Sequence, residues 1–269
     1  MENAGAGLAN VVAREYAANS ERGVLGWVGS GNNGGDTLVA LAHLAQKGWR
    51  ATAVLIRQRA QDDPLVKRLQ DAGGKVLPIN IDPDLQVFDA EIHGHAVFLD
   101  GILGTGIKLP VKPDLAHVMA FIREAVNKVE DGHVIAVDCP SGVDCDTGEA
   151  PPECIPAELT VTMAAIKQGL LCFPAADLVG ELLVARIGRV EETQAWQAVR
   201  RVAPDEGDVR PLLPRRPRYS HKGTFGTALI VAGIVFRLGP DRQIATVRRA
   251  RVLRWAALVP LVLQGLFFL

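Results

Sequence analysis

The sequence predicts an α/β fold with a mostly parallel sheet covered by helices on both faces, and three observations support this. Short apolar runs typical of buried strands alternate with segments whose apolar residues recur at helical spacing. Three of the predicted strands end in polar loops that contain glycine. The chain has 269 residues, 48% of them hydrophobic, which is enough to bury a large core.

The expected helices and strands alternate along the chain. An alanine-rich helix over residues 5–19 precedes a first strand at 24–28. The next helix, 36–47, carries leucines at helical spacing, and Gly48 suits its C-terminal end. Pro64 suits the first turn of the helix that follows the second strand. The remaining expected strands are 51–56, 75–78, 96–99, 134–137, 159–162, 181–187 and 228–232, and the remaining helices are 64–72 and 115–129.

The loop from Gly29 to Asp36 is the most informative stretch of the chain. It reads Gly-Ser-Gly-Asn-Asn-Gly-Gly-Asp, and Asp36 opens the next predicted helix. In an open α/β sheet the junction between a strand and a helix N-terminus binds phosphate-bearing ligands, and glycines let the backbone approach them. The alternative is a glycine-rich turn in which Asp36 only caps the helix. The spacing matches neither the dinucleotide-binding Gly-x-Gly-x-x-Gly nor a P-loop, which requires a lysine.

Two further strand ends carry oxygen-bearing side chains. Asp100 follows one strand, ahead of the Gly104-Thr105-Gly106 turn, and Asp138 and Ser141 follow the next strand. Because the carboxyl ends of parallel strands share one edge of the sheet, these loops can converge with the first on one crevice. A buried carboxylate such as Asp138 needs donors, a cation or a substrate, although either aspartate could also serve only to stabilise a turn.

The side chains expected at this edge suit a weakly bound, hard cation, because they offer several oxygen atoms and few carboxylates. No histidine joins them. His43 is expected in a helix, and His93 and His95 in a polar loop where solvated positions are favoured over a metal site. The four cysteines show no zinc-binding spacing and are typical of thiols in a reducing cytosol.

The net charge and the residues near both termini bear on nucleic-acid binding, cellular location and membrane anchoring. The net charge of −1 argues against a broad nucleic-acid-binding face, and the N-terminus lacks the features of a signal peptide, so we expect a cytoplasmic protein. Prolines among charged residues indicate a linker over 201–220. The apolar stretch 255–269 falls short of the roughly 20 residues that span a bilayer. We therefore favour a frameshifted or truncated remnant at 234–269 over a membrane anchor.

Four strings of the sequence resemble the NAD(P)H-hydrate epimerase family, the YjeF N-terminal domain. They are GNNGGD (31–36), FLDGILGTG (98–106), VDCPSGVDCDTGE (137–149) and LTVTMAAIKQGLL (159–171). The resemblance implies a Rossmann-like three-layer α/β/α sandwich for residues 1–200. It also implies an enzyme that interconverts the R and S forms of hydrated NADH and NADPH (NADHX and NADPHX) at nicotinamide C6.

A fifth string, YSHKGTFGTALIVAG (219–233), resembles the opening of the ADP/ATP-dependent NAD(P)H-hydrate dehydratase domain. Residues 221–269 are therefore expected to hold an incomplete start of that ribokinase-like domain, followed by an aberrant apolar tail. Dehydratase activity is not expected from so short a match.

The epimerase resemblance also implies roles for individual residues. Asp138 is implied to lie at the reacting carbon, where we expect it to act as the catalytic general acid and base. Lys167 also matches a family position, and a structural role is favoured for it over that of a supporting cation. One K+ per subunit is implied, held by Asn33, Asp100 and Ser141. Besides Asp138, the residues implied to contact substrate are Asn32, Asn33, Gly34, Gly35, Asp36, Gly104, Thr105, Gly106, Ile107, Lys108, Leu109 and Pro110.

Two other functions stand beside the epimerase. One is a non-catalytic module that holds a nucleotide or a protein partner in the same crevice. The other, an NAD dehydrogenase, is disfavoured because Gly-x-Gly-x-x-Gly is absent. The expected partner is a small-molecule substrate, NADHX or NADPHX, with no nucleic acid and no membrane, and a homodimer is left open. The sequence does not indicate which of the two hydrates is preferred.

Overall fold

Alternating strands and helices make up the first of two units into which the chain divides. The computed structural model describes residues 1–79, 85–188, 190–200, 202–204, 206–213, 219, 228–235 and 246–253. The two units are Met1–Ala203 and Pro204–Leu269. The division of function between an epimerase region, a linker and a dehydratase start stays a prediction.

The helices and strands have the following bounds. The strands of the first unit are β1 (Val24–Val28), β2 (Ala51–Leu55), β3 (Lys75–Pro78), β4 (Val97–Gly101), β5 (His133–Val137), β6 (Leu159–Met163) and β7 (Glu181–Ala185). Its helices are α1 (Glu2–Glu15), α2 (Asn32–Gln46), α3 (Pro64–Asp71), α4 (Gln86–Gly94), α5 (Pro113–Val126) and α6 (Gln194–Gln197). The second unit contains α7 (Glu206–Val209), β8 (Ala228–Val235) and β9 (Thr246–Leu253).

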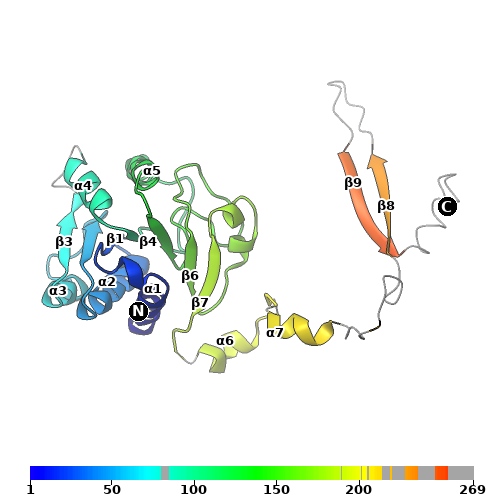
Figure 1. Ribbon diagram of the computed structural model, residues 1–269, viewed down its shortest axis with the longest axis horizontal. Coiled ribbons are helices and arrows are strands. Elements are labelled where there is room, and N and C mark those ends of the chain that lie inside the picture. The colour runs from blue at the N-terminus through cyan, green and yellow to red at the C-terminus, as the bar shows by residue number, and fades with distance from the viewer. Residues whose placement is uncertain are drawn as a thin grey trace, which may run out of the picture. The chain divides into compact units, whose positions relative to one another are not determined.

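The seven strands of the first unit form one parallel sheet, in the order β3-β2-β1-β4-β5-β6-β7 (Figure 1). The strand order reverses direction between β1 and β4. At such a switch point the connecting helices leave toward opposite faces, and a crevice opens beyond the carboxyl ends of the two strands. The Rossmann-like sandwich that the resemblance implied is confirmed by this topology.

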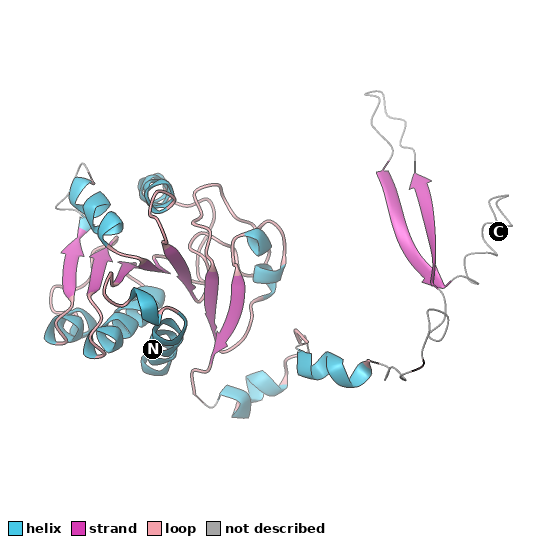
Figure 2. Cartoon of the chain, in the orientation of Figure 1, coloured by secondary structure: helices cyan, strands magenta, loops and turns pink. Residues whose placement is uncertain are grey.

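Helices cover both faces of the sheet (Figure 2). On one face, α1, α2 and α3 bury Leu8, Leu41 and Leu69 in one apolar cluster. On the other, α4 and α5 bury residues such as Ile92 and Met119 in a second cluster. Successive β1 side chains point to opposite faces, as the pleat requires, so every residue of this strand is buried. The sheet edge where β1, β4 and β5 end therefore rests on a rigid core.

The structure corrects the predicted start of the second helix. We expected it to begin at Asp36, but α2 begins at Asn32, so the Asn-Asn-Gly-Gly-Asp string forms its first turns. Gly31, at the N-cap, is extended, and Asp36 accepts no capping hydrogen bond there. The first backbone N–H groups of α2 have no partner within the helix, which makes this helix end suited to a negatively charged ligand.

Other boundaries also differ from the prediction. β4 runs to Gly101 and includes Asp100, because the ladder with β1 pairs Trp27 with Asp100. The histidines expected in a polar loop lie at the end of α4, which the sequence did not predict, and His95 is buried against Thr52. The first helix spans 2–15 instead of 5–19, and α5 spans 113–126 instead of 115–129.

The second unit contains an antiparallel pair, β8 and β9, where a strand was expected at 228–232. The apolar stretch 255–269, interpreted above as a remnant or an anchor, lies outside the described residues. Within the described part of the chain, no helix has the length and apolar character that crossing a bilayer requires.

Candidate functional site

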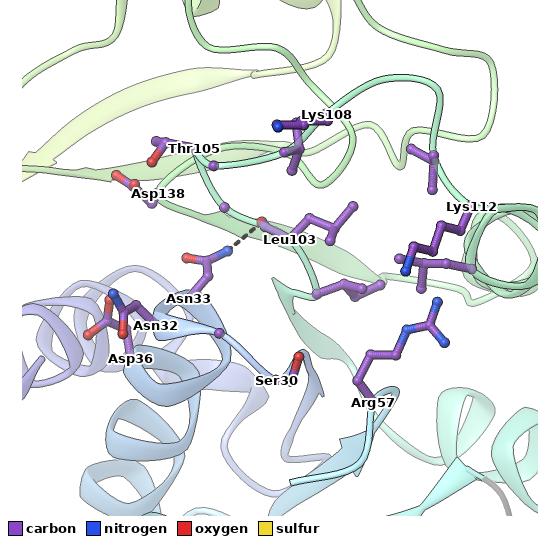
Figure 3. A pocket seen from close by; sticks show the side chains of 17 residues that line it. Ser30, Asn32, Asn33, Asp36, Arg57, Leu103, Thr105, Lys108, Lys112 and Asp138 are labelled. Carbon is purple, nitrogen blue, oxygen red and sulfur yellow. Dashed lines mark hydrogen bonds between the residues drawn. The ribbon is translucent and has the colours of Figure 1, made fainter.

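A cavity of about 890 Å³ opens at the carboxyl ends of the central strands (Figure 3). It lies where the strand order reverses, as expected for a ligand site in such a sheet. Its walls come from the start of α2, the loop after β4, the region after β2, the start of α5 and the end of β5. The lining residues are Ser30, Gly31, Asn32, Asn33, Asp36, Arg57, Ile102, Leu103, Gly104, Thr105, Gly106, Ile107, Lys108, Val111, Lys112, Leu115 and Asp138.

The start of α2 is fixed to the loop after β4 by Asn33. Its amide nitrogen donates a hydrogen bond to the Leu103 carbonyl at 2.7 Å, which leaves the amide oxygen free of any donor among the described residues. Thr37 fastens the same turn by donating to the Asn33 carbonyl at 2.8 Å. The loops after β1 and β4 are therefore held together by a specific contact.

Gly34 lets the first turn of α2 pack tightly onto the loop after β1. A Cβ atom on Gly34 would lie 2.0 Å from the Gly29 carbonyl oxygen, which is a backbone atom that cannot rotate away. Gly35 is likewise surrounded by protein and does not line the cavity. Neither glycine lines the cavity, and their expected contact with the substrate stays a prediction.

Asp100 and Ser141 form a buried pair beneath the cavity. Both side chains are fully buried. Ser141 donates its hydroxyl to Oδ1 of Asp100 at 2.5 Å and its backbone N–H to Oδ2 at 2.8 Å. The Ser141 hydroxyl also accepts a hydrogen bond from the Leu103 N–H at 2.9 Å. Burial is the main cause that raises the pKa of Asp100 to about 6. No cationic side chain among the described residues pairs with this carboxylate.

Asp138 reaches the cavity from the end of β5 and has one oxygen engaged. Its Oδ1 accepts hydrogen bonds from the Met163 N–H at 2.8 Å and from the Thr162 hydroxyl at 3.3 Å, and it pairs with the Lys167 ammonium group. No described residue donates to its Oδ2. The backbone of Asp138 has a φ of 67°, a conformation that is uncommon for a residue with a side chain. A strained residue with a free oxygen at a cavity is typical of a functional position.

Lys167 is positioned by three acceptors at once. Besides Asp138, it donates to the Thr162 hydroxyl at 2.8 Å and to the Met163 carbonyl at 3.0 Å. Of the structural and supporting roles considered from the sequence, these contacts favour a supporting cation that orients Asp138.

Asp36 is a second carboxylate at the cavity, with few partners. Its side chain is 13% exposed, and Oδ1 lies 3.8 Å from the N-terminal amine without forming a hydrogen bond to it. Burial is the largest cause that raises the pKa of Asp36 to about 6, and the nearby Asp138 charge adds to it.

Three cations line the cavity as well, and the sequence reasoning identified one of them. Lys108 was expected at the site, whereas Arg57 and Lys112 were not. Arg57 follows β2, and at a switch point this position faces the crevice, so strand order was the signal that could have found it. Leu109 and Pro110, expected at the site, do not line the cavity.

The geometry brings together the residues on which the sequence argument depended. Asn33 and Asp138 line one cavity, whereas Asp100 and Ser141 do not line it and are connected to it through the hydrogen bond from the Leu103 N–H to Ser141. Within the described residues, no cluster of three or more histidine, cysteine or acidic side chains could hold a metal ion. The four cysteines are free thiols.

Comparisons with known proteins identify relatives of this chain. The chain is 34% identical over 240 residues to a bifunctional NAD(P)H-hydrate repair enzyme from Moorella thermoacetica, covering 87% of this chain and 44% of that protein. It is 35% identical to an NAD(P)H-hydrate epimerase from Cenarchaeum symbiosum, covering 72% of this chain and 86% of that protein. The chain thus spans about half the length of the bifunctional relatives it matches.

The crystal structure of yeast ynu0 shares the fold, with a TM-score of 0.56 and 22% identity over 68% of this chain and 76% of that one. The family model described as the YjeF-related protein N-terminus matches residues 1–169. The chain therefore belongs to the YjeF-related protein N-terminal family.

Proposed function

We propose that this chain epimerises hydrated NAD(P)H, interconverting the R and S forms of NADHX and NADPHX at nicotinamide C6. The names of the relatives support this proposal, since both an epimerase and a bifunctional repair enzyme match the region that contains the cavity. The single observation that carries it is the shared cavity, which joins the helix start at Asn33 to the free oxygen of Asp138.

In the proposed reaction Asp138 transfers a proton to and from the oxygen atom bound to C6. Its Oδ2, to which no described residue donates, protonates the departing C6 hydroxyl while the ring nitrogen lone pair forms an iminium, and the hydroxyl leaves as water. Water then returns from either face, with the same carboxylate taking the proton back. Lys167 and the Met163 N–H hold Oδ1, so only Oδ2 is available to the substrate.

A potassium ion fits the residues that the resemblance implies for it. Asp100 is a fully buried carboxylate without a cationic partner among the described residues, and such a charge is costly to bury alone. Asn33 and Ser141 add neutral oxygen ligands, which hard cations prefer. A bound K+ would supply positive charge that compensates the ionised Asp100. We propose these three residues as its ligands.

We also propose a cytoplasmic location, which the four free thiols support. The assembly state stays a prediction, with a homodimer left open by the sequence, and cell fractionation together with light scattering of the purified chain tests both points.

One experiment separates the enzyme from the binding module. The purified chain is incubated with a single NADHX epimer, with and without K+, and the epimers are resolved by chromatography. Appearance of the other epimer, faster with K+, supports the proposal. Binding of the hydrate without conversion supports the module instead and overturns the proposal.

A further inference from the structure

The cavity has two chemically different ends. Asp36 and Asp138 lie on one side of it, and Arg57 and Lys112 on the other (Figure 3). The acidic side contains the proposed reacting residue. The cationic side takes no part in the proposed proton transfer. Its positive charges therefore suit a negatively charged group in another part of the ligand.

Strand order sets the span between these ends. Arg57 comes two residues after β2 ends, and Asp138 directly follows β5. β1 and β4 lie between them, so three strand spacings separate the two ends, about 14 Å at the usual spacing. A ligand that reaches both ends must be long, as a dinucleotide is, with its reacting ring at one end and its adenosine at the other.

The cations at the far end are available to an anion. Arg57 pairs with Asp114 at 2.6 Å, but the carboxylate is 62% exposed, and an ion pair with a partner so exposed contributes little. Lys112 forms no ion pair with any residue that the structure describes. Positive side chains gathered at one cavity repel each other unless a negative group neutralises them.

Apolar side chains lie next to these cations. Val111 and Leu115 flank Lys112 in the sequence, line the cavity with it, and are almost fully buried. A flat, apolar base packed there would place its ribose within reach of the cations. In dinucleotide-binding sheets that carry Gly-x-Gly-x-x-Gly, an acid near the end of the second strand binds the ribose 2′-hydroxyl, and an arginine there accommodates a 2′-phosphate. Arg57 follows the second strand at the corresponding place, although the glycine motif is absent from this chain.

We propose that Arg57, assisted by Lys112, binds the 2′-phosphate of the substrate, so that the chain prefers NADPHX to NADHX. This inference rests on the proposed function. Arginine suits the position because its planar guanidinium forms paired, charge-assisted hydrogen bonds with phosphate oxygens.

The kinetic test compares both hydrates on the intact chain and on Arg57→Met, with Arg14→Met as the matched control. Arg14 is an exposed arginine on α1 whose side chain pairs, among the described residues, with its neighbour Glu15. We expect the parent to show a KM about tenfold lower for NADPHX, the value of one charge-assisted hydrogen bond. We expect Arg57→Met to abolish this difference by raising the KM for NADPHX, and Arg14→Met to retain it. Equal KM values in the parent, or an equal rise for both hydrates in Arg57→Met, would overturn the proposal.

A binding measurement keeps the inference separate from the epimerase proposal. Calorimetry with adenosine 2′,5′-bisphosphate and with AMP needs no turnover. Tighter binding of the bisphosphate, lost in Arg57→Met and kept in Arg14→Met, supports the 2′-phosphate site even if neither hydrate is epimerised. Equal binding of the two nucleotides contradicts it even if both hydrates are epimerised.

Discussion

The buried Asp36 carboxylate at the cavity is expected to lower the free energy of unfolding near neutral pH, and this effect can be measured. Its pKa is raised from 3.8 to about 6, mainly by burial, so the folded chain binds a proton there more tightly than the unfolded chain does. The contribution of Asp36 to the free energy of unfolding therefore falls as the pH rises from about 4 to about 6, and stays lower above that. Replacing Asp36 with asparagine removes this fall.

The size of the effect follows from the shift. A shift from 3.8 to about 6 corresponds to about 3 kcal/mol at neutral pH. The asparagine amide leaves polar atoms in the same poorly partnered place, at a cost of about 1 kcal/mol. We therefore expect Asp36→Asn to be more stable than the parent by about 2 kcal/mol at pH 7.5, which raises Tm by about 4 to 8 °C.

Thermal unfolding followed by circular dichroism at pH 4 and pH 7.5 measures this difference. Asp62→Asn is the matched control, since Asp62 is an exposed aspartate outside the cavity. We expect the stabilisation in Asp36→Asn to be close to zero at pH 4 and in Asp62→Asn to be small at both pH values. The reasoning is refuted if Asp36→Asn is less stable at pH 7.5, or equally stabilised at both.

Three further predictions follow from contacts in the site. Lys167→Met removes the ammonium group that orients Asp138, and we expect kcat to fall at least about tenfold with KM little changed; an unchanged kcat contradicts this. Gly101→Ala places a Cβ atom 1.9 Å from the Thr37 hydroxyl, so urea unfolding should show a loss of about 1–3 kcal/mol, and parent-like stability rules this out. Ser141→Ala leaves a buried carboxylate short of a donor, so the variant should need more K+ for half-maximal activity than the parent; the same requirement argues against the ion site.

Most of the sheet could be predicted from the sequence because its strands are continuous apolar runs between punctuating glycines and prolines. The end of β4 could not, because Asp100 is a poor strand residue taken alone. It belongs to the strand because it pairs with Trp27 on β1. This contact joins residues far apart in the sequence, so the local residue pattern does not predict it. The start of α2 was missed for a related reason. Glycines at 34 and 35 argue against a helix locally, yet the close packing of Gly34 on Gly29 requires a glycine at that position.

The convergence of the candidate site was predictable because parallel strands place their ends at one edge. The cationic end of the cavity could not be predicted, because Arg57 belongs to no motif. Its place at the cavity follows from the position of β2 beside β1. The contact of Lys167 with Asp138 also depends on the turn after β6, which sequence spacing alone does not place.

The most direct test of the account is the Asp138→Asn variant. The variant keeps the size of the side chain but cannot exchange a proton as a carboxylic acid does. It is incubated with one NADPHX epimer at saturating K+, with its Tm measured alongside to show that it folds. We predict that the folded variant still binds the hydrate while its epimerisation rate falls at least about a hundredfold, the usual contribution of a general acid–base group. A folded Asp138→Asn chain that interconverts the epimers at the parent's rate would contradict the account.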